Sequence, residues 1–144
     1  MQAYQHIVVA VDLSPEAHQV VARAQDLAAH YGARLSLVHV VEPVVTDVAY
    51  DLMPAVPVEI ETDLVERARQ YLDSLAEEAG LGQAQRLVEV GSVKGELLRL
   101  AEEERVDLIV VGTHGRHGVS MMLGSTANAV LHGTPCDVLA VRVQ

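Results

Sequence analysis

The stretch His6-Ile7-Val8-Val9-Ala10-Val11-Asp12-Leu13-Ser14-Pro15-Glu16 decides the fold of this chain. Residues 7–11 form a continuous apolar run rich in β-branched side chains, which is typical of a strand buried on both faces of a parallel sheet. Ser14 then provides a predicted helix N-cap, followed by a proline that fits the first helical turn. Apolar residues recur every three or four positions as far as Tyr31, which predicts an amphipathic helix ended by a left-handed Gly32.

Strands and helices alternate along the rest of the chain. This alternation predicts a single doubly wound α/β domain over residues 1–144, with a parallel sheet of five strands and four helices distributed over its two faces. Residues 42–58 contain three prolines and mixed polarity, and we expect a loop there. The further strands are predicted at residues 35–41, 86–90, 106–111 and 138–143, and the further helices at residues 60–79, 92–104 and about 125–132.

The ends of two predicted strands point to a binding site. In open parallel sheets, ligands bind beyond the carboxyl ends of the strands, at the place where the strand order reverses. The first strand ends at Asp12 and the fourth ends at Gly112. If these two strands are neighbours across the reversal, Asp12 and the glycine-rich segment that follows Gly112 face the same crevice.

That glycine-rich segment, residues 112–126, has three features that favour phosphate. Its glycines allow close approach of the backbone to an anion. Gly124-Ser125-Thr126 opens a predicted helix, where free N–H groups and the positive end of the dipole converge. Arg116 and two histidines, His114 and His117, add donors. The segment lacks the lysine of the Walker pattern and the dinucleotide G-x-G-x-x-G, so a loop that only turns the chain is the alternative interpretation.

Composition and charge exclude several classes of function. The formal net charge is −10, from 10 Lys+Arg and 20 Asp+Glu. This sign argues against a nucleic-acid binder and against a protein of anionic membrane surfaces. One cysteine and the absence of a long apolar run favour a reducing, cytoplasmic location. The acids are unevenly spread: 15 of the 20 lie in residues 42–104, while residues 106–144 contain only Asp107 and Asp137.

Four segments together resemble the universal stress protein A family, and the resemblance covers the whole chain. The first is the opening stretch quoted above. The second is Ser36-Leu37-Val38-His39-Val40, and the third is Val110-Val111-Gly112-Thr113-His114-Gly115. The fourth is the ending, from Gly124-Ser125-Thr126 to Pro135-Cys136-Asp137-Val138-Leu139-Ala140-Val141. The combination is specific, although each segment alone is not.

The resemblance implies the strand order 3-2-1-4-5 and a homodimer in which the last strands, Val138 to Val143, meet across a two-fold axis. An apolar strand at the edge of a sheet favours the same pairing on physical grounds. The resemblance also implies ATP or AMP as ligand, with any Mg²⁺ brought by the nucleotide. Asp12 would contact the ribose or the adenine edge. Ala10 and Val40 would line the adenine pocket, Val111 and Gly112 would lie near the ribose, and Gly115, Arg116, Gly124, Ser125 and Thr126 would hold the phosphates.

One departure from the family pattern keeps other functions open. Eight residues separate Gly115 from Gly124, one fewer than in the nucleotide-binding members. We therefore weigh a nucleotide-binding regulatory protein against a nucleotide-independent dimer that acts through protein partners. A slow ATPase is the third possibility, but no residue is assigned to catalysis and none to a resident metal. His39 is interpreted as a core histidine with a hydrogen-bond partner, and Cys136 as a small buried apolar residue.

Overall fold

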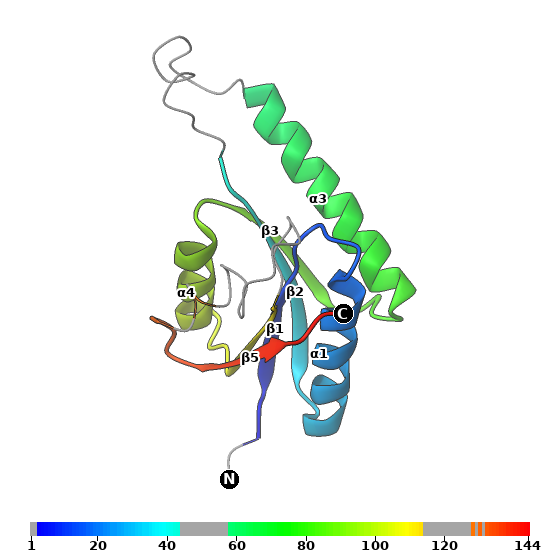
Figure 1. Cartoon of the computed structure of the whole chain (residues 1–144), viewed down its shortest axis with the longest axis vertical. Coiled ribbons are helices and arrows are strands. Elements are labelled where there is room, and N and C mark those ends of the chain that lie inside the picture. Colours follow the sequence, from blue (N-terminus) through cyan, green and yellow to red (C-terminus); the bar gives the residue numbers. More distant parts are fainter. Residues whose placement is uncertain (1–2, 44–57, 114–127, 129, 131) are drawn as a thin grey trace.

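Five parallel strands form one sheet with helices packed against both of its faces (Figure 1). The computed structural model describes residues 3–43, 58–113, 128, 130 and 132–144. The strand order β3-β2-β1-β4-β5 confirms the predicted order. In chain order the elements are β1 (His6–Ala10), α1 (Ala17–Tyr31), β2 (Arg34–Val41), α3 (Val58–Glu78), β3 (Gln85–Val90), α4 (Val93–Glu103), β4 (Leu108–Gly112) and β5 (Asp137–Val141).

β1 is the central strand and sets the position of the site. Ile7 pairs with Leu35 of β2 on one side and with Leu108 of β4 on the other. The chain first builds outward from β1 through β2 to β3, and then crosses over to add β4 and β5 on the opposite side. The strand order therefore reverses between β1 and β4, which is the place where a ligand of such a sheet is expected.

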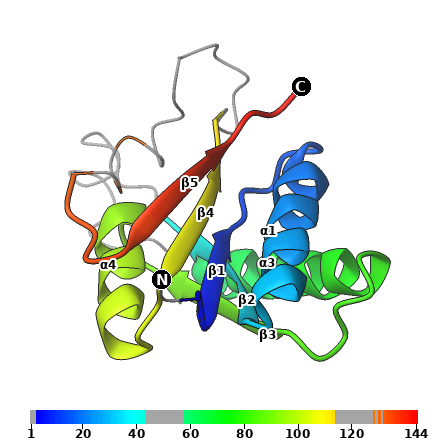
Figure 2. The same ribbon diagram turned by 90° about the horizontal axis from the view of Figure 1, so that it is seen from below.

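Alternate residues of the strands bury themselves in two separate apolar layers. Ile7 and Val9 belong to a cluster with buried residues of α1 and α3, whereas Val8 belongs to a cluster with buried residues of α4. Figure 2 shows α1 and α3 on one side of the sheet and α4 on the other. This division follows from the two-residue period of a strand, and it confirms that the sheet is covered on both faces.

The start of α1 differs from the prediction. Ser14 does not cap the helix: Glu16 is the N-cap residue and makes no side-chain cap hydrogen bond. The hydroxyl of Ser14 instead donates to Oδ1 of Asp12 at 2.5 Å. Asp12 stands two residues earlier, and its side chain takes the hydroxyl that would otherwise cap the helix.

The other helix ends follow local sequence signals more closely. Gly32 ends α1 with φ of 65°, and Ser92 caps α4 by accepting the N–H of Gly95 at 3.0 Å, both as predicted.

The fourth predicted helix, at about 125–132, lies mostly outside the described residues, and only Asn128 and Val130 are described with helical backbone. Within the described ranges, every helix is too short or too polar to span a bilayer.

A chain of hydrogen bonds runs through the sheet at the amino ends of β1, β2 and β3. Nδ1 of His6 lies 2.9 Å from Nη2 of Arg34 and 3.1 Å from the carbonyl oxygen of Glu104, and Nε2 lies 2.8 Å from Oγ of Ser36. Ser36 in turn donates to Oε1 of Gln85 at 3.1 Å. His6 is 3% exposed, and its burial lowers the pKa of the imidazole below the ordinary value. The pKa of His6 stays below its ordinary value although the Glu104 carbonyl and the Asp107 carboxylate both raise it.

We expect His6 to make the protein less stable in mild acid. The unfolded chain takes up a proton at His6 near pH 6.5, whereas the folded chain, with its lowered pKa, does not. The contribution of His6 to the free energy of unfolding is therefore fully present above that pH. Below it, this contribution falls by about 1.4 kcal/mol per pH unit until the folded pKa is reached. Urea unfolding at several pH values checks this. The dependence should be reduced in His6→Gln and kept in His30→Gln, which removes an exposed histidine. Equal dependence in all three proteins would contradict the assignment.

Candidate functional site

The carboxyl ends of β1, β2 and β4 bring five of the predicted site residues to one edge of the sheet. Ala10 pairs with Val38 and Val9 pairs with Val110. Continuing this register by two residues puts Asp12 level with Val40, and by three residues puts it level with Thr113. Ala10, Asp12, Val40, Val111 and Gly112 therefore lie together at the reversal of strand order, although they come from three separate parts of the chain.

The floor of this edge is apolar. Val111 is 1% exposed and Val40 is 9% exposed, and Ala10 packs against the same cluster from β1. Ala10 and Gly112 are half-buried. Small and aliphatic side chains at this edge suit a flat, uncharged ring system better than a charged group.

Asp12 is the ionisable group at the centre of the edge. Its carboxylate is half-buried and accepts two hydrogen bonds from Ser14, one from the backbone N–H at 3.1 Å and one from the hydroxyl. Both of these bonds go to Oδ1. Within the described ranges 3–43, 58–113 and 132–144, no hydrogen bond to Oδ2 is seen, so this oxygen can accept a hydroxyl of a ligand.

Two side chains that the sequence did not identify as site residues hold the turn around Asp12. The Nδ1 of His39 lies 2.7 Å from the carbonyl of Val11, and the hydroxyl of Tyr71 donates to the carbonyl of Ser14 at 3.0 Å. Burial raises the pKa of Tyr71, and the negative charge of Asp12 raises it further. His39 thereby has the hydrogen-bond partner that was predicted for it. No local motif predicts either contact, since Tyr71 is 57 residues away from its partner along the chain.

The junction of β4 and β5 fixes the point from which the glycine-rich segment departs. The N–H of Thr113 donates to the carbonyl of Val141 at 2.9 Å, and the N–H of Val143 donates to Oγ1 of Thr113 at 3.2 Å. On the far side of the segment, Val130 is fully buried in the cluster that contains Val40 and Val111. Both flanks of the segment are therefore anchored in the body of the domain.

The predicted phosphate-contacting residues lie outside the described part of the chain. These are Gly115, Arg116, Gly124, Ser125 and Thr126, and their roles stay predictions. The two acids of residues 106–144 are described, and they lie at the opposite edge of the sheet. Asp107 accepts the backbone N–H of Gln5 at 2.7 Å, and Asp137 accepts the hydroxyl of Tyr4 at 2.7 Å. Neither carboxylate is therefore close to the carboxyl ends of β4 and β5.

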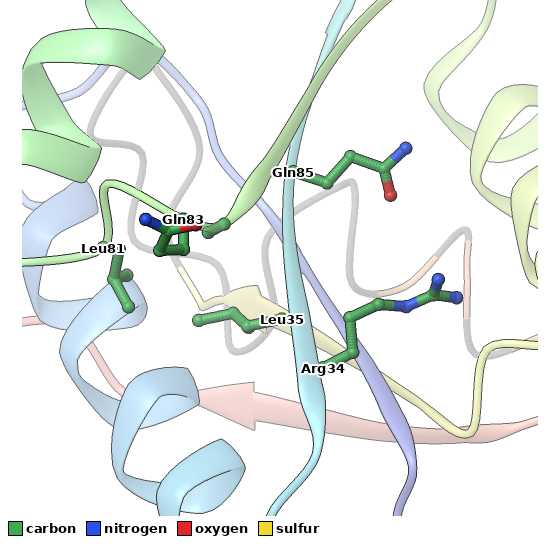
Figure 3. A pocket seen from close by; sticks show the side chains of 6 residues that line it. Arg34, Leu35, Leu81, Gln83 and Gln85 are labelled. Carbon is green, nitrogen blue, oxygen red and sulfur yellow. The ribbon is translucent and has the colours of Figure 1, made fainter.

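A hollow of about 470 Å³ lies at the amino ends of β2 and β3, away from the predicted site (Figure 3). Leu35 and Arg34 point to opposite sides of β2 there, so the hollow follows the rim of the sheet rather than entering one face. The carboxyl ends of α1 and α3 lie on this edge, and their dipoles disfavour an anion. None of the predicted site residues lines this hollow, which is formed by Arg34, Leu35, Leu81, Gln83, Ala84 and Gln85.

Cys136 has the surroundings of a structural thiol. Its side chain is half-buried, and its Sγ lies 3.1 Å from Oγ1 of Thr134. Burial raises the pKa of the thiol, which lowers the fraction present as the reactive thiolate. The interpretation of Cys136 as a small apolar residue rather than a nucleophile agrees with this geometry.

Comparison with known proteins gives consistent matches along the chain. The Universal stress protein family matches residues 3–142. Universal stress protein A homolog 2 of Coxiella burnetii is 41% identical over 146 residues, covering 100% of this chain and 99% of that protein. Homolog 1 of the same organism is 42% identical over 140 residues, covering 96% of each protein.

Solved structures show the same fold. A structure described as hypothetical protein MJ0577 superposes with a TM-score of 0.82 at 22% identity, covering 99% of both chains. A structure described as a universal stress protein in complex with cAMP superposes with a TM-score of 0.69 at 28% identity, covering 98% of both chains. The likeness to the first structure concerns the fold alone. The second structure is that of a similar protein bound to cAMP.

Proposed function

Since the chain belongs to the universal stress protein family, we propose that it is a regulatory protein that binds an adenine nucleotide, ATP or AMP, at the carboxyl edge of its sheet. The observation that carries this proposal is the convergence of Asp12, Val40 and Gly112 where the strand order reverses. The glycine-rich segment begins at the same place. One similar protein of known structure is described as a complex with cAMP, which supports a nucleotide of this class.

Each part of a nucleotide has a matching part of this edge. The apolar surface formed by Ala10 and Val40 suits the adenine ring, and Oδ2 of Asp12 suits a ribose hydroxyl. The phosphates would extend toward Gly115, Arg116 and the Gly124-Ser125-Thr126 turn, where backbone N–H groups and one guanidinium offset the net charge of −10. A Mg²⁺ ion would arrive with the phosphates and be held chiefly by them.

A second proposal concerns assembly. We propose a homodimer in which β5 of one protomer pairs with β5 of its partner, through residues Val138 to Val143. The N–H of Asp137 and the carbonyl of Val141 bond toward β4. Alternate residues of a strand bond to opposite sides, so the backbone groups of Val138 and Ala140 point away from β4, toward an edge that no described strand covers. A second copy would satisfy these groups.

Cellular context and mode of action complete the proposal. We place the protein in the cytoplasm, because its single cysteine is a half-buried thiol rather than half of a disulfide.

Bound nucleotide would change the glycine-rich segment that a protein partner contacts. The nucleotide-independent dimer remains the competing function, and the eight-residue spacer between Gly115 and Gly124 is the feature that favours it.

Titration calorimetry on the nucleotide-free protein tests the proposed ligand. We expect saturable binding of ATP or AMP, with ATP strengthened by Mg²⁺ and GTP binding more weakly than ATP. Phosphate release should stay at the level of a protein-free blank, since the proposal assigns no base to the γ-phosphate. Turnover above that of an Asp12→Ala variant would instead support the slow ATPase. Absence of saturation by every nucleotide at millimolar concentration would contradict the proposed ligand.

A further inference from the structure

We infer that Tyr71 and His39 form a clasp that positions Asp12 for the nucleotide. The term clasp denotes these two side chains together with the carbonyls of Ser14 and Val11 that they bond. The inference rests on the proposed function, because it assigns a positioning role within the same site. It adds Tyr71 of α3 and His39 of β2 to the site. Neither of them is among the site residues predicted from the sequence.

The first contact of the clasp comes from the neighbouring strand. A backbone carbonyl can only accept a hydrogen bond, so the proton lies on Nδ1 of His39, which donates to Val11 at 2.7 Å. The N–H of Val11 also donates to the carbonyl of Val38 at 2.8 Å. Both polar groups of the residue before Asp12 are thus tied to β2. This fixes the direction in which the chain leaves the sheet.

The second contact comes from a helix. The hydroxyl of Tyr71, on α3, reaches across to the carbonyl of Ser14 at 3.0 Å. Ser14 in turn donates both its N–H and its hydroxyl to Oδ1 of Asp12. A continuous path of hydrogen bonds therefore runs from Tyr71 through Ser14 to the carboxylate. The ring of Tyr71 packs against the apolar cluster of α1 and α3, which keeps the hydroxyl in place.

The clasp has a direct consequence for affinity. A carboxylate that is already oriented loses less conformational freedom when a ribose hydroxyl binds to it. Removing the Tyr71 hydroxyl leaves the ring in the apolar layer but frees the turn. We expect Tyr71→Phe to weaken binding of Mg-ATP about five-fold, the range set by one intramolecular hydrogen bond. His39→Leu should act in the same direction, whereas His39→Asn, with an amide donor close to the position of Nδ1, should restore most of the affinity.

Tyr4→Phe is the matched control for Tyr71→Phe. It also deletes one tyrosine hydroxyl that makes a hydrogen bond, in this case to Asp137 at 2.7 Å. Tyr4 lies before β1, at the opposite edge of the sheet, so its loss should leave the affinity for Mg-ATP unchanged. Thermal unfolding of both variants separates an effect on binding from a general loss of stability.

A double-mutant cycle distinguishes positioning from a merely structural role. The affinity for Mg-ATP is measured by calorimetry for the parent chain, Tyr71→Phe, Asp12→Ala and the double variant. If Tyr71 acts through Asp12, Tyr71→Phe should weaken binding about five-fold in the parent and less than about two-fold in the Asp12→Ala background. Equal affinity of the parent and Tyr71→Phe, or equal losses in both backgrounds, would overturn the clasp. If the parent itself binds no ATP, the proposed function fails, and the clasp as a device for nucleotide binding fails with it.

Discussion

Gly124→Asp is expected to abolish nucleotide binding while leaving the fold intact. Gly124 lies outside the described residues, and its role is predicted from the Gly124-Ser125-Thr126 turn that opens a helix. If the proposed site is right, a carboxylate placed there would face the phosphates. Two unit charges about 4 Å apart repel by about 4 kcal/mol at an effective dielectric constant of about 20, which corresponds to roughly a 1,000-fold loss of affinity. Calorimetric titration with Mg-ATP checks the result.

Gly82→Asp provides the matched control. It adds the same charge to an exposed glycine near the amino end of β3, where an added Cβ meets no atom within 4 Å. Both variants should unfold at temperatures close to that of the nucleotide-free parent. Only Gly124→Asp should lose the affinity. Similar affinity of the two variants for Mg-ATP would show that the phosphates do not approach Gly124.

Ala140→Pro is expected to weaken the dimer. Ala140 lies in β5, and its N–H points away from β4, so proline removes a donor from the free edge without breaking the ladder inside the sheet. The two-fold axis makes the substitution act twice. Two lost hydrogen bonds at about 1 kcal/mol each weaken the dimer by about 30-fold in Kd. Analytical ultracentrifugation over a range of micromolar concentrations measures this.

Ala140→Thr tests whether the backbone donor is the important group. Threonine keeps the N–H and suits an edge strand, so this variant should remain a dimer. If the parent sediments as a monomer, or if Ala140→Pro dimerises as strongly as Ala140→Thr, pairing through β5 is wrong.

The fold could be predicted because its signals are local. The β-branched run of residues 7–11 indicated a buried central strand, and the alternation of strands and helices indicated the parallel sheet. Gly32 and Ser92 marked helix ends because the group that each of them bonds lies within a few residues. Ser14 was predicted wrongly as a cap for an equally local reason. The side chain of Ser14 could bond either the N–H groups at the start of α1 or the carboxylate of Asp12, and its hydroxyl donates to the carboxylate.

The candidate site could be predicted only in part. Asp12, Val40 and Gly112 follow from the rule that strand ends of a parallel sheet share one edge. Tyr71 and His39 could not be found, because their partners are carbonyl groups, which every residue carries. A sequence pattern identifies side chains but not the backbone group that a distant side chain reaches. Such contacts become visible only when the packing of α3 against the sheet is known.

The nucleotide content of gently purified protein tests the central claim most directly. The protein is denatured, and the released small molecules are separated by ion-exchange chromatography, with thermal unfolding in added Mg-ATP as a parallel measurement. We predict released adenine nucleotide, or a rise in the unfolding temperature that is lost in Gly124→Asp. Ligand at about 100 times its Kd should add about 2.7 kcal/mol of stability. No released nucleotide and no shift up to millimolar Mg-ATP would contradict nucleotide binding and favour a dimer that acts through protein partners alone.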